Sequence, residues 1–189
     1  MNQEYCIRDT INLIKDDFYS YFHKEWSLGR ILCYSLKTFF KGFGWVVLLR
    51  FSQCRCKFIA VIAKILKTHY AHKYCIDIPA CINIGKRFSI GHGYGIVIHG
   101  NTVIGDNVTV SQFVNIGSTN GEFAVIGNNV YIGPMTCIVG GVRIGNNVTI
   151  GAGSVVVKDI PDNATAAGNP ARVLNYDNPG MKIGVKKMN

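Results

Sequence analysis

Acidic side chains and long apolar runs are both scarce in this chain of 189 residues. Eleven Asp and Glu stand against 20 Lys and Arg, which gives a formal net charge of +9. A membrane-spanning helix needs about 20 mostly apolar residues. The best apolar stretches here, 45–49 and 58–63, are separated by Arg50, Arg55 and Lys57. We therefore expect no transmembrane helix.

The chain also lacks the features of a secretory signal and of a metal site. No basic stretch followed by a long apolar stretch stands near residue 1. The seven Cys show no C-x-x-C spacing, and the only His residues beyond residue 75 are His92 and His99, too few for a three-His zinc site. These absences predict a cytoplasmic protein with reduced thiols and no metal. The basic segment described next leaves a position at the inner face of the membrane open.

The positive charge is concentrated in the first part of the chain. Residues 1–75 hold 12 Lys and Arg against 5 Asp and Glu, whereas residues 76–189 hold 8 against 6. Ile7, Ile11, Ile14 and Phe18 recur at helical spacing. A basic, aromatic-rich helical segment could contact an anionic membrane surface through residues 30–73. Alternatively, its helices pack on each other or on a partner subunit. No nucleic acid is expected, because no recognised binding module accompanies the charge.

A period of six residues dominates the rest of the chain. The aliphatic positions of this period are Ile84, Ile90, Ile98, Ile104, Val110, Ile116, Ile126, Ile132, Ile138, Ile144, Ile150 and Val156. A second apolar series follows four residues later in many repeats, as at Phe88 and Val108, and Gly commonly follows the aliphatic residue. Such a period indicates a solenoid.

Six residues make one short strand and one turn, and three such units make one triangular coil of about 18 residues. Twelve repeats therefore predict a mainly β fold, a left-handed parallel β-helix of about four coils with an N-terminal α-helical segment. We expect the helical segment at residues 1–75, the β-helix at 76–160, and a C-terminal extension and tail at 161–189. The fold alone does not define the chemistry.

The period is broken twice, and insertions in a solenoid become surface loops that often carry function. The step from Ile90 to Ile98 is eight residues and encloses Gly91-His92-Gly93-Tyr94-Gly95; the step from Ile116 to Ile126 is ten. His92 lies between two glycines, and imidazole is the side chain most often used as a general base.

Asp77 is the candidate partner of His92. It precedes His92 by fifteen residues, roughly one coil, so its carboxylate could orient the imidazole from the adjacent layer. The alternative is that Asp77 only caps the first coil. His99 is a second, weaker candidate for the base.

These residues resemble the serine acetyltransferase-like branch of the hexapeptide acyltransferases over about residues 75–174. The closing segments 150–156 and 167–172 are common to the superfamily. Residues 88–93, Phe-Ser-Ile-Gly-His-Gly, resemble the catalytic segment of serine acetyltransferases and of capsule or exopolysaccharide enzymes of the colanic acid type. The resemblance implies that His92 is the catalytic base and Asp77 its partner.

The chain departs from serine acetyltransferases where those enzymes hold the amino acid. Their Asp before the catalytic His corresponds to Gly91, and their later Arg-His pair corresponds to Glu122 and Phe123. An α-carboxylate favours the planar fork of Arg, whereas Phe and Glu suit a sugar ring and its hydroxyls. We therefore expect a glycan acceptor: a hydroxyl of a cell-surface polysaccharide, its repeat unit or a lipid-linked precursor. Tyr94, Glu122 and Phe123 would contact it.

The resemblance also implies that acetyl-CoA is the co-substrate and binds between the subunits of a homotrimer or a dimer of trimers. Gly133, Ala152 and Gly153 would line its groove, and Lys158 and Arg172 would lie near its phosphates. His92 would deprotonate the acceptor hydroxyl for direct attack on the thioester.

Three other functions stay open. The first is a serine O-acetyltransferase of cysteine biosynthesis that holds the serine carboxylate in another way. The second is a small-sugar or antibiotic acetyltransferase of the same fold, and the third is a non-enzymatic β-helix scaffold.

Overall fold

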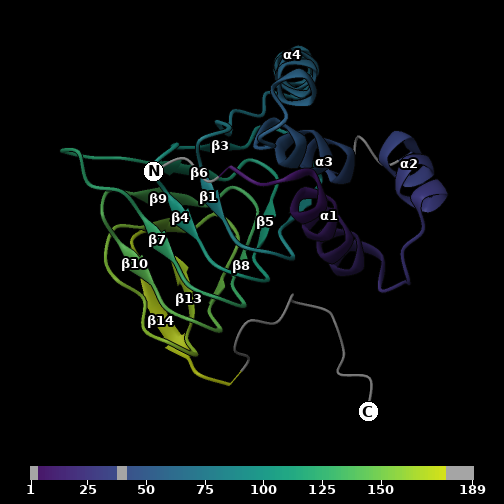
Figure 1. Cartoon of the computed structure of the whole chain (residues 1–189). Coiled ribbons are helices and arrows are strands. Elements are labelled where there is room, and N and C mark those ends of the chain that lie inside the picture. The colour runs from purple at the N-terminus through teal and green to yellow at the C-terminus, as the bar shows by residue number, and fades with distance from the viewer. Residues whose placement is uncertain (1–3, 38–41, 178–189) are drawn as a thin grey trace.

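The computed structural model describes residues 4–37 and 42–177, which form a group of helices followed by a parallel β-helix (Figure 1). The helices are α1 (Ile7–Phe22), α2 (Leu28–Lys37), α3 (Phe43–Ser52) and α4 (Lys57–Tyr74). The strands are short: β1 (Asn83–Ile84), β2 (Ser89–Gly91), β3 (Val97–Ile98), β4 (Val103–Ile104), β5 (Thr109–Ser111), β6 (Asn115–Gly117), β7 (Val125–Ile126), β8 (Tyr131–Ile132), β9 (Cys137–Val139), β10 (Arg143–Ile144), β11 (Thr149–Ile150), β12 (Val155–Val156), β13 (Thr165–Gly168) and β14 (Ala171–Asn175). Residues 178–189 of the predicted tail lie outside the described residues.

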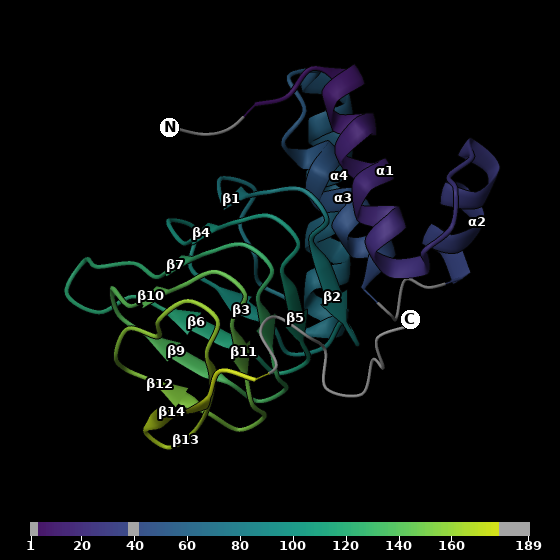
Figure 2. The same ribbon diagram turned by 90° about the horizontal axis from the view of Figure 1, so that it is seen from below.

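Three sheets form the faces of the β-helix, and successive strands step from one sheet to the next (Figure 2). The orders are β1-β4-β7-β10, β2-β5-β8-β11-β13-β14 and β3-β6-β9-β12. Strands three apart in the chain pair in parallel, so Ile84 lies opposite Ile104 and Ile104 opposite Ile126. One coil therefore takes three strands. The predicted β-helix of about four coils, with a helical segment before it, is confirmed.

The aliphatic positions of the period form one continuous core. All twelve, from Ile84 to Val156, have exposed fractions of 2% or less. Thr136 and Ser154 occupy smaller inward positions, and their hydroxyls donate to the carbonyls of Gly133 and Gly151 at 2.8 and 2.6 Å. Removing this apolar area from water stabilises the coils by about 25 cal/mol per Å².

The Gly and Asn residues that follow the aliphatic position are explained by close stacking at one corner. A Cβ on Gly127 would lie 2.7 Å from the carbonyl oxygen of Gly145 in the next coil. Asn129 and Asn147 both have φ of 56°, a left-handed conformation that Asn tolerates, and their amides are joined by a 2.9 Å hydrogen bond. The recurring Ile-Gly-Asn-Asn pattern thus serves coil stacking.

The chain adds two strands after the period of six ends. β13 extends the six-stranded sheet beside β11 in parallel, and β14 turns back antiparallel on β13. The sheet therefore continues past residue 160, the predicted end of the β-helix domain. No sequence pattern predicted β13 and β14, because these two strands do not continue the six-residue period.

The N-terminal helices cap the open edge of the first coil with side chains. The Asp17 carboxylate accepts from the backbone N–H of Phe88 at 2.8 Å. The Arg50 guanidinium donates to the carbonyl of Ile84 at 3.0 Å, and the Gln53 amide donates to that of Ile82 at 2.8 Å. Each contact satisfies a backbone group that has no neighbouring coil to pair with.

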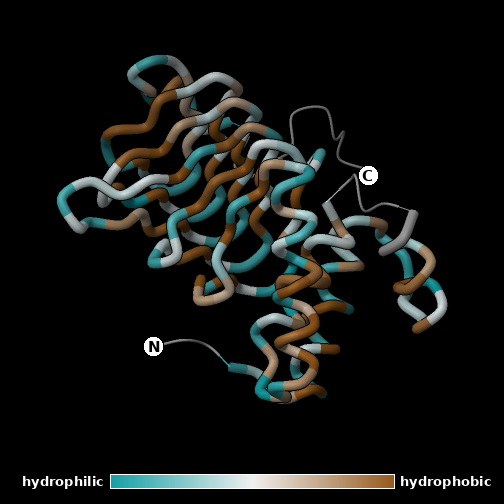
Figure 3. The backbone as a smooth tube through the Cα atoms, turned by 90° about the horizontal axis from the view of Figure 1, so that it is seen from above, coloured by the Kyte–Doolittle hydropathy of each residue, from teal (hydrophilic) through white to brown (hydrophobic). Residues whose placement is uncertain are grey.

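Helix α4 packs on α3 but leaves one of its faces uncovered. Ala60, Ala63 and Tyr74 are buried, whereas Phe58 and Ile65 are exposed. The tube coloured by hydropathy shows hydrophobic residues along these helices (Figure 3). Within the described residues, no helix is long and apolar enough to cross a bilayer.

Candidate active site

His92 lies at the corner where the chain passes from β2 to β3 in the first coil. Its φ is 54°, and its side chain is exposed. The first break in the period makes the loop at this corner longer than the loops in the coils below. An exposed imidazole on an inserted loop can reach the hydroxyl of a bound acceptor, which is the geometry that a general base requires.

The loop that carries His92 rests on the helical segment. The Tyr21 hydroxyl on α1 accepts from the N–H of Ile90 at 2.5 Å and donates to its carbonyl at 3.0 Å. Gly42 has φ of 92°, and a Cβ there would lie 2.6 Å from the Ile90 carbonyl oxygen. A Cβ on Gly93 would in turn lie 3.2 Å from the Cα of Gly42. The helices therefore fix the backbone on both sides of His92.

Tyr21 and Gly42 were not predicted as site residues. Tyr21 is 69 residues away from Ile90, and no local pattern links the two. Burial raises the pKa of Tyr21, so its hydroxyl stays protonated and keeps both hydrogen bonds.

Tyr94, the predicted acceptor contact, is half exposed and lies two residues after His92. Its ring meets the ring of Tyr74 edge-on, with centroids 5.5 Å apart. The carbonyl of Tyr74, the last residue of α4, accepts from the N–H of Gly95 at 3.0 Å. The end of α4 therefore braces the same loop.

Asp77 lies at the same end of the β-helix as His92 but is paired with a different residue. Its N–H donates to the carbonyl of Ile96 at 2.7 Å, and its carbonyl accepts from the N–H of Ile98 at 2.8 Å, which places it opposite Val97. The inserted residues at 91–96 make this coil longer, so Asp77 does not stand beside His92 in the ladder. No hydrogen bond joins the two side chains in the described part of the chain. Their pairing in catalysis stays a prediction.

Glu122 and Phe123 lie in the loop between β6 and β7, at the opposite corner of the β3–β6–β9–β12 sheet from His92. Thr119 and Glu122 form a tight hairpin, in which the N–H of Glu122 donates to the carbonyl of Thr119 at 3.0 Å. The Phe123 ring stacks on His99, with centroids 4.8 Å apart. In one copy of the chain, these residues are separated from His92 by the width of a sheet.

The residues predicted to bind acetyl-CoA divide into two groups. Ala152, Gly153, Lys158 and Arg172 are exposed on the late coils, and a Cβ on Gly153 would meet nothing within 4 Å. Their contact with acetyl-CoA stays a prediction. Gly133 is buried, and a Cβ there would lie 2.7 Å from the backbone nitrogen of Ala152. Its missing side chain is explained by coil stacking.

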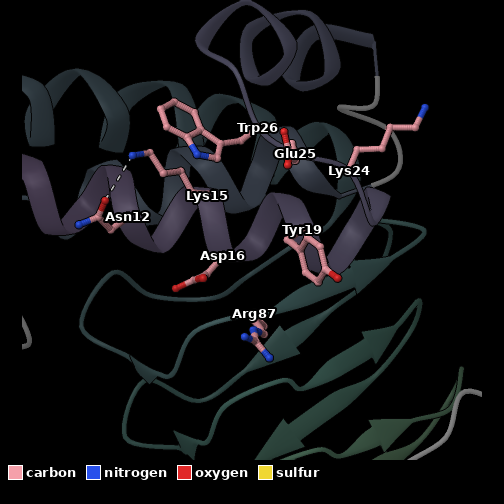
Figure 4. Close-up of a pocket in the computed structure, with 8 residues that line it drawn as sticks. All are labelled: Asn12, Lys15, Asp16, Tyr19, Lys24, Glu25, Trp26 and Arg87. Atoms are coloured by element: carbon pink, nitrogen blue, oxygen red, sulfur yellow. Dashed lines mark hydrogen bonds between the residues drawn. The ribbon is translucent and has the colours of Figure 1, made fainter.

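A separate pocket of about 700 Å³ lies between α1, the segment after it and the first coil (Figure 4). Within it, the Lys15 ammonium lies 3.7 Å from the centre of the Trp26 ring. None of the predicted site residues lines this pocket. Its lining residues are Asn12, Lys15, Asp16, Tyr19, Lys24, Glu25, Trp26 and Arg87.

Sequence comparison finds acetyltransferases. Residues 123–158 match the family model "Bacterial transferase hexapeptide (six repeats)". The chain is 40% identical over 113 residues to a serine acetyltransferase of Staphylococcus aureus, a match that covers 58% of this chain and 52% of the relative. It is 38% identical over 124 residues to mitochondrial serine acetyltransferase 3 of Arabidopsis thaliana, covering 63% of this chain and 32% of the relative. The chain thus spans about half the length of these curated relatives, or less.

Solved structures give the same result. The serine acetyltransferase of Neisseria gonorrhoeae in complex with serine superposes with a TM-score of 0.74 and 25% identity, over 89% of this chain and 70% of that one. The soybean serine acetyltransferase apoenzyme superposes with a TM-score of 0.63 and 33% identity, over 71% and 58%.

These matches correct the predicted acceptor. The relatives are serine acetyltransferases, so the expectation of a polysaccharide hydroxyl and of a capsule or colanic acid type enzyme was wrong, and the serine alternative is favoured. The physical reason lies in Glu122 and Phe123. They were interpreted as a sugar-binding surface, but one face of the Phe123 ring is already covered by His99, so the pair does not form the open apolar platform that a sugar ring would need. The chain therefore carries a hexapeptide-repeat β-helix that is similar to those of serine acetyltransferases.

Proposed function

We propose that this chain catalyses the O-acetylation of serine with acetyl-CoA as the donor. The observation that supports it most directly is the 40% identity over 113 residues to a serine acetyltransferase. The exposed His92 on a braced loop supplies the base that this reaction needs.

In the proposed reaction, the imidazole of His92 removes the proton of the serine hydroxyl. The serine oxygen bonds to the acetyl carbon, and a backbone N–H stabilises the oxyanion that forms. The carbon–sulfur bond then breaks, and the leaving CoA sulfur takes the proton back from the imidazolium. The products are O-acetylserine and CoA, with no covalent acyl-enzyme.

We further propose that the working unit is a trimer. His92 and the Glu122–Phe123 hairpin lie at different corners of the coil, so one copy does not bring them together. The face and corners between them expose apolar side chains to solvent, including Val97, Phe113 and Met135, the last with 66% of its surface accessible. Burying this face against the next copy would place the His92 corner of one beside the hairpin of the other.

The test is a CoA-release assay with acetyl-CoA and serine, using galactosides as comparison acceptors. Wild type should release CoA in a serine-dependent manner. His92→Gln should lose about a hundredfold or more of kcat, as expected for the loss of a general base. His72→Gln, at an exposed histidine of α4, is the matched control and should retain most of the activity. Serine-independent release, or equal rates for wild type and His92→Gln, would reject the proposal.

A further inference from the structure

Helix α4 presents an uncovered apolar stripe to solvent. Phe58, Val61, Ile62 and Ile65 recur at helical spacing of three and four residues and are all exposed, with 76% for Phe58 and 64% for Ile65. Figure 1 shows α4 at the outer edge of the helical group, beyond α3. Single exposed apolar residues are ordinary, but a contiguous stripe of large ones indicates a binding surface.

The charged side chains on α4 itself are all basic, although Glu4 from the start of the chain lines a pocket together with Val61 and Lys64. Residues 26–76 contain nine Lys and Arg and no Asp or Glu. Arg55, Lys57 and Lys64 are exposed on or next to α4. Lys67 is engaged differently, since its ammonium donates to the carbonyl of Ile78 at 2.7 Å. A partner that complements this surface is therefore apolar at its centre and carries negative charge around it.

We propose that α4 lies flat on an anionic lipid surface, with its apolar stripe among the acyl chains and its lysines at the headgroups. A helix of 18 residues is about 27 Å long, which is enough for a stable interfacial contact. This narrows the membrane contact predicted for residues 30–73, of which 38–41 lie outside the described residues.

A second copy of the chain is the less favoured occupant. Two α4 helices packed face to face would bring their cations together, and no carboxylate within residues 26–76 could pair them. Anionic headgroups attract each surface lysine instead, and the attraction weakens as salt screens it. The proposal does not depend on the acceptor of the acetyl group.

The experiment is co-sedimentation of the full chain with vesicles of phosphatidylcholine alone or with about a quarter phosphatidylglycerol. Wild type should bind only the anionic vesicles and should detach as salt is raised. Ile65→Ser and Lys64→Glu should each lower the partition coefficient about tenfold. Matched controls are Leu174→Ser, at an equally exposed apolar residue on β14, and Lys86→Glu, at an exposed lysine on the first coil.

Equal binding of Ile65→Ser and Leu174→Ser would overturn the proposal, as would a failure of wild type to bind anionic vesicles at low salt. Self-association that Ile65→Ser abolishes, without vesicle binding, would assign the face to a second copy instead. Thermal melts of all four variants should match wild type, because each substituted side chain is exposed.

Discussion

Arg50 and Asp17 form a fully buried ion pair that joins α3 to α1 directly above the first coil. The Arg50 Nε lies 2.8 Å from the Asp17 carboxylate, and neither side chain is exposed. Both also bind the coil: Asp17 accepts from Phe88, and Arg50 donates to Ile84 and Gly85. Desolvation raises the pKa of Asp17, and the Arg50 charge opposes that rise. The pair is therefore the point where helices and β-helix depend on one another.

Arg50→Met should cost about 3–5 kcal/mol of unfolding free energy, because it leaves the Asp17 carboxylate buried without its cation. The double variant Asp17→Asn/Arg50→Met should be more stable than Arg50→Met, since Asn still accepts from Phe88 without a buried charge. Urea unfolding of the three proteins measures this. A double variant less stable than the single one would contradict the argument.

Tyr21→Phe should weaken both stability and catalysis. It removes the hydroxyl that bonds the N–H and carbonyl of Ile90, at a cost of about 1–3 kcal/mol. Because Ile90 is two residues before His92, kcat for CoA release should fall while KM for serine changes little. A loss of stability with unchanged kcat would show that Tyr21 does not position His92.

Alkaline pH gives an independent check on Tyr21. Burial raises its pKa above the 10.0 of an unfolded Tyr. The contribution of Tyr21 to the free energy of unfolding is therefore fully present below pH 10. It is lost as the pH rises above 10, because Tyr21 then ionises in the unfolded chain but not in the folded one. The difference in unfolding free energy between wild type and Tyr21→Phe should stay constant up to about pH 10 and shrink above it. A difference that shrinks already near neutral pH would contradict this.

Gly127→Ala should destabilise the β-helix by about 1–3 kcal/mol, because its Cβ would press on the carbonyl oxygen of Gly145. Gly117→Ala is the matched control. A Cβ there meets nothing within 4 Å, so it should be neutral or stabilising by up to about 1 kcal/mol. Urea unfolding measures both, and equal effects would mean that coil stacking does not explain the glycine.

Met135→Glu should dissociate the proposed trimer and abolish serine-dependent CoA release, although His92 is untouched. A charge at this exposed corner would be buried without a partner in the assembly. Val103→Glu, at an exposed residue of the neighbouring sheet, is the control and should leave both properties intact. Light scattering after gel filtration gives the mass. A monomeric Met135→Glu that keeps its activity would contradict the shared site.

Much of the fold could be predicted from the sequence because the aliphatic residues of the β-helix recur at a fixed period of six. Each residue from Ile84 to Val156 in the series is buried as its spacing requires, and the first break in the period holds the His92 loop. The cap could not be predicted, since Tyr21 and Ile90 meet across 69 residues without any repeating pattern. The spacing of Asp77 predicts its coil but not its exact register, because the insertion at 91–96 sets the Asp77 backbone opposite Val97; its pairing with His92 stays a prediction.

The capped first coil also bears on how this protein avoids forming fibres. The first and last coils of a solenoid each have a backbone edge without a neighbouring coil, and such an edge, when exposed, can template the stacking of another molecule. Asp17, Gln53 and Arg50 occupy that edge with side chains instead of strands. Loss of the helical segment would therefore do more than free the loop that carries His92. It would expose the unpaired backbone edge of the first coil, from which end-to-end aggregates could grow.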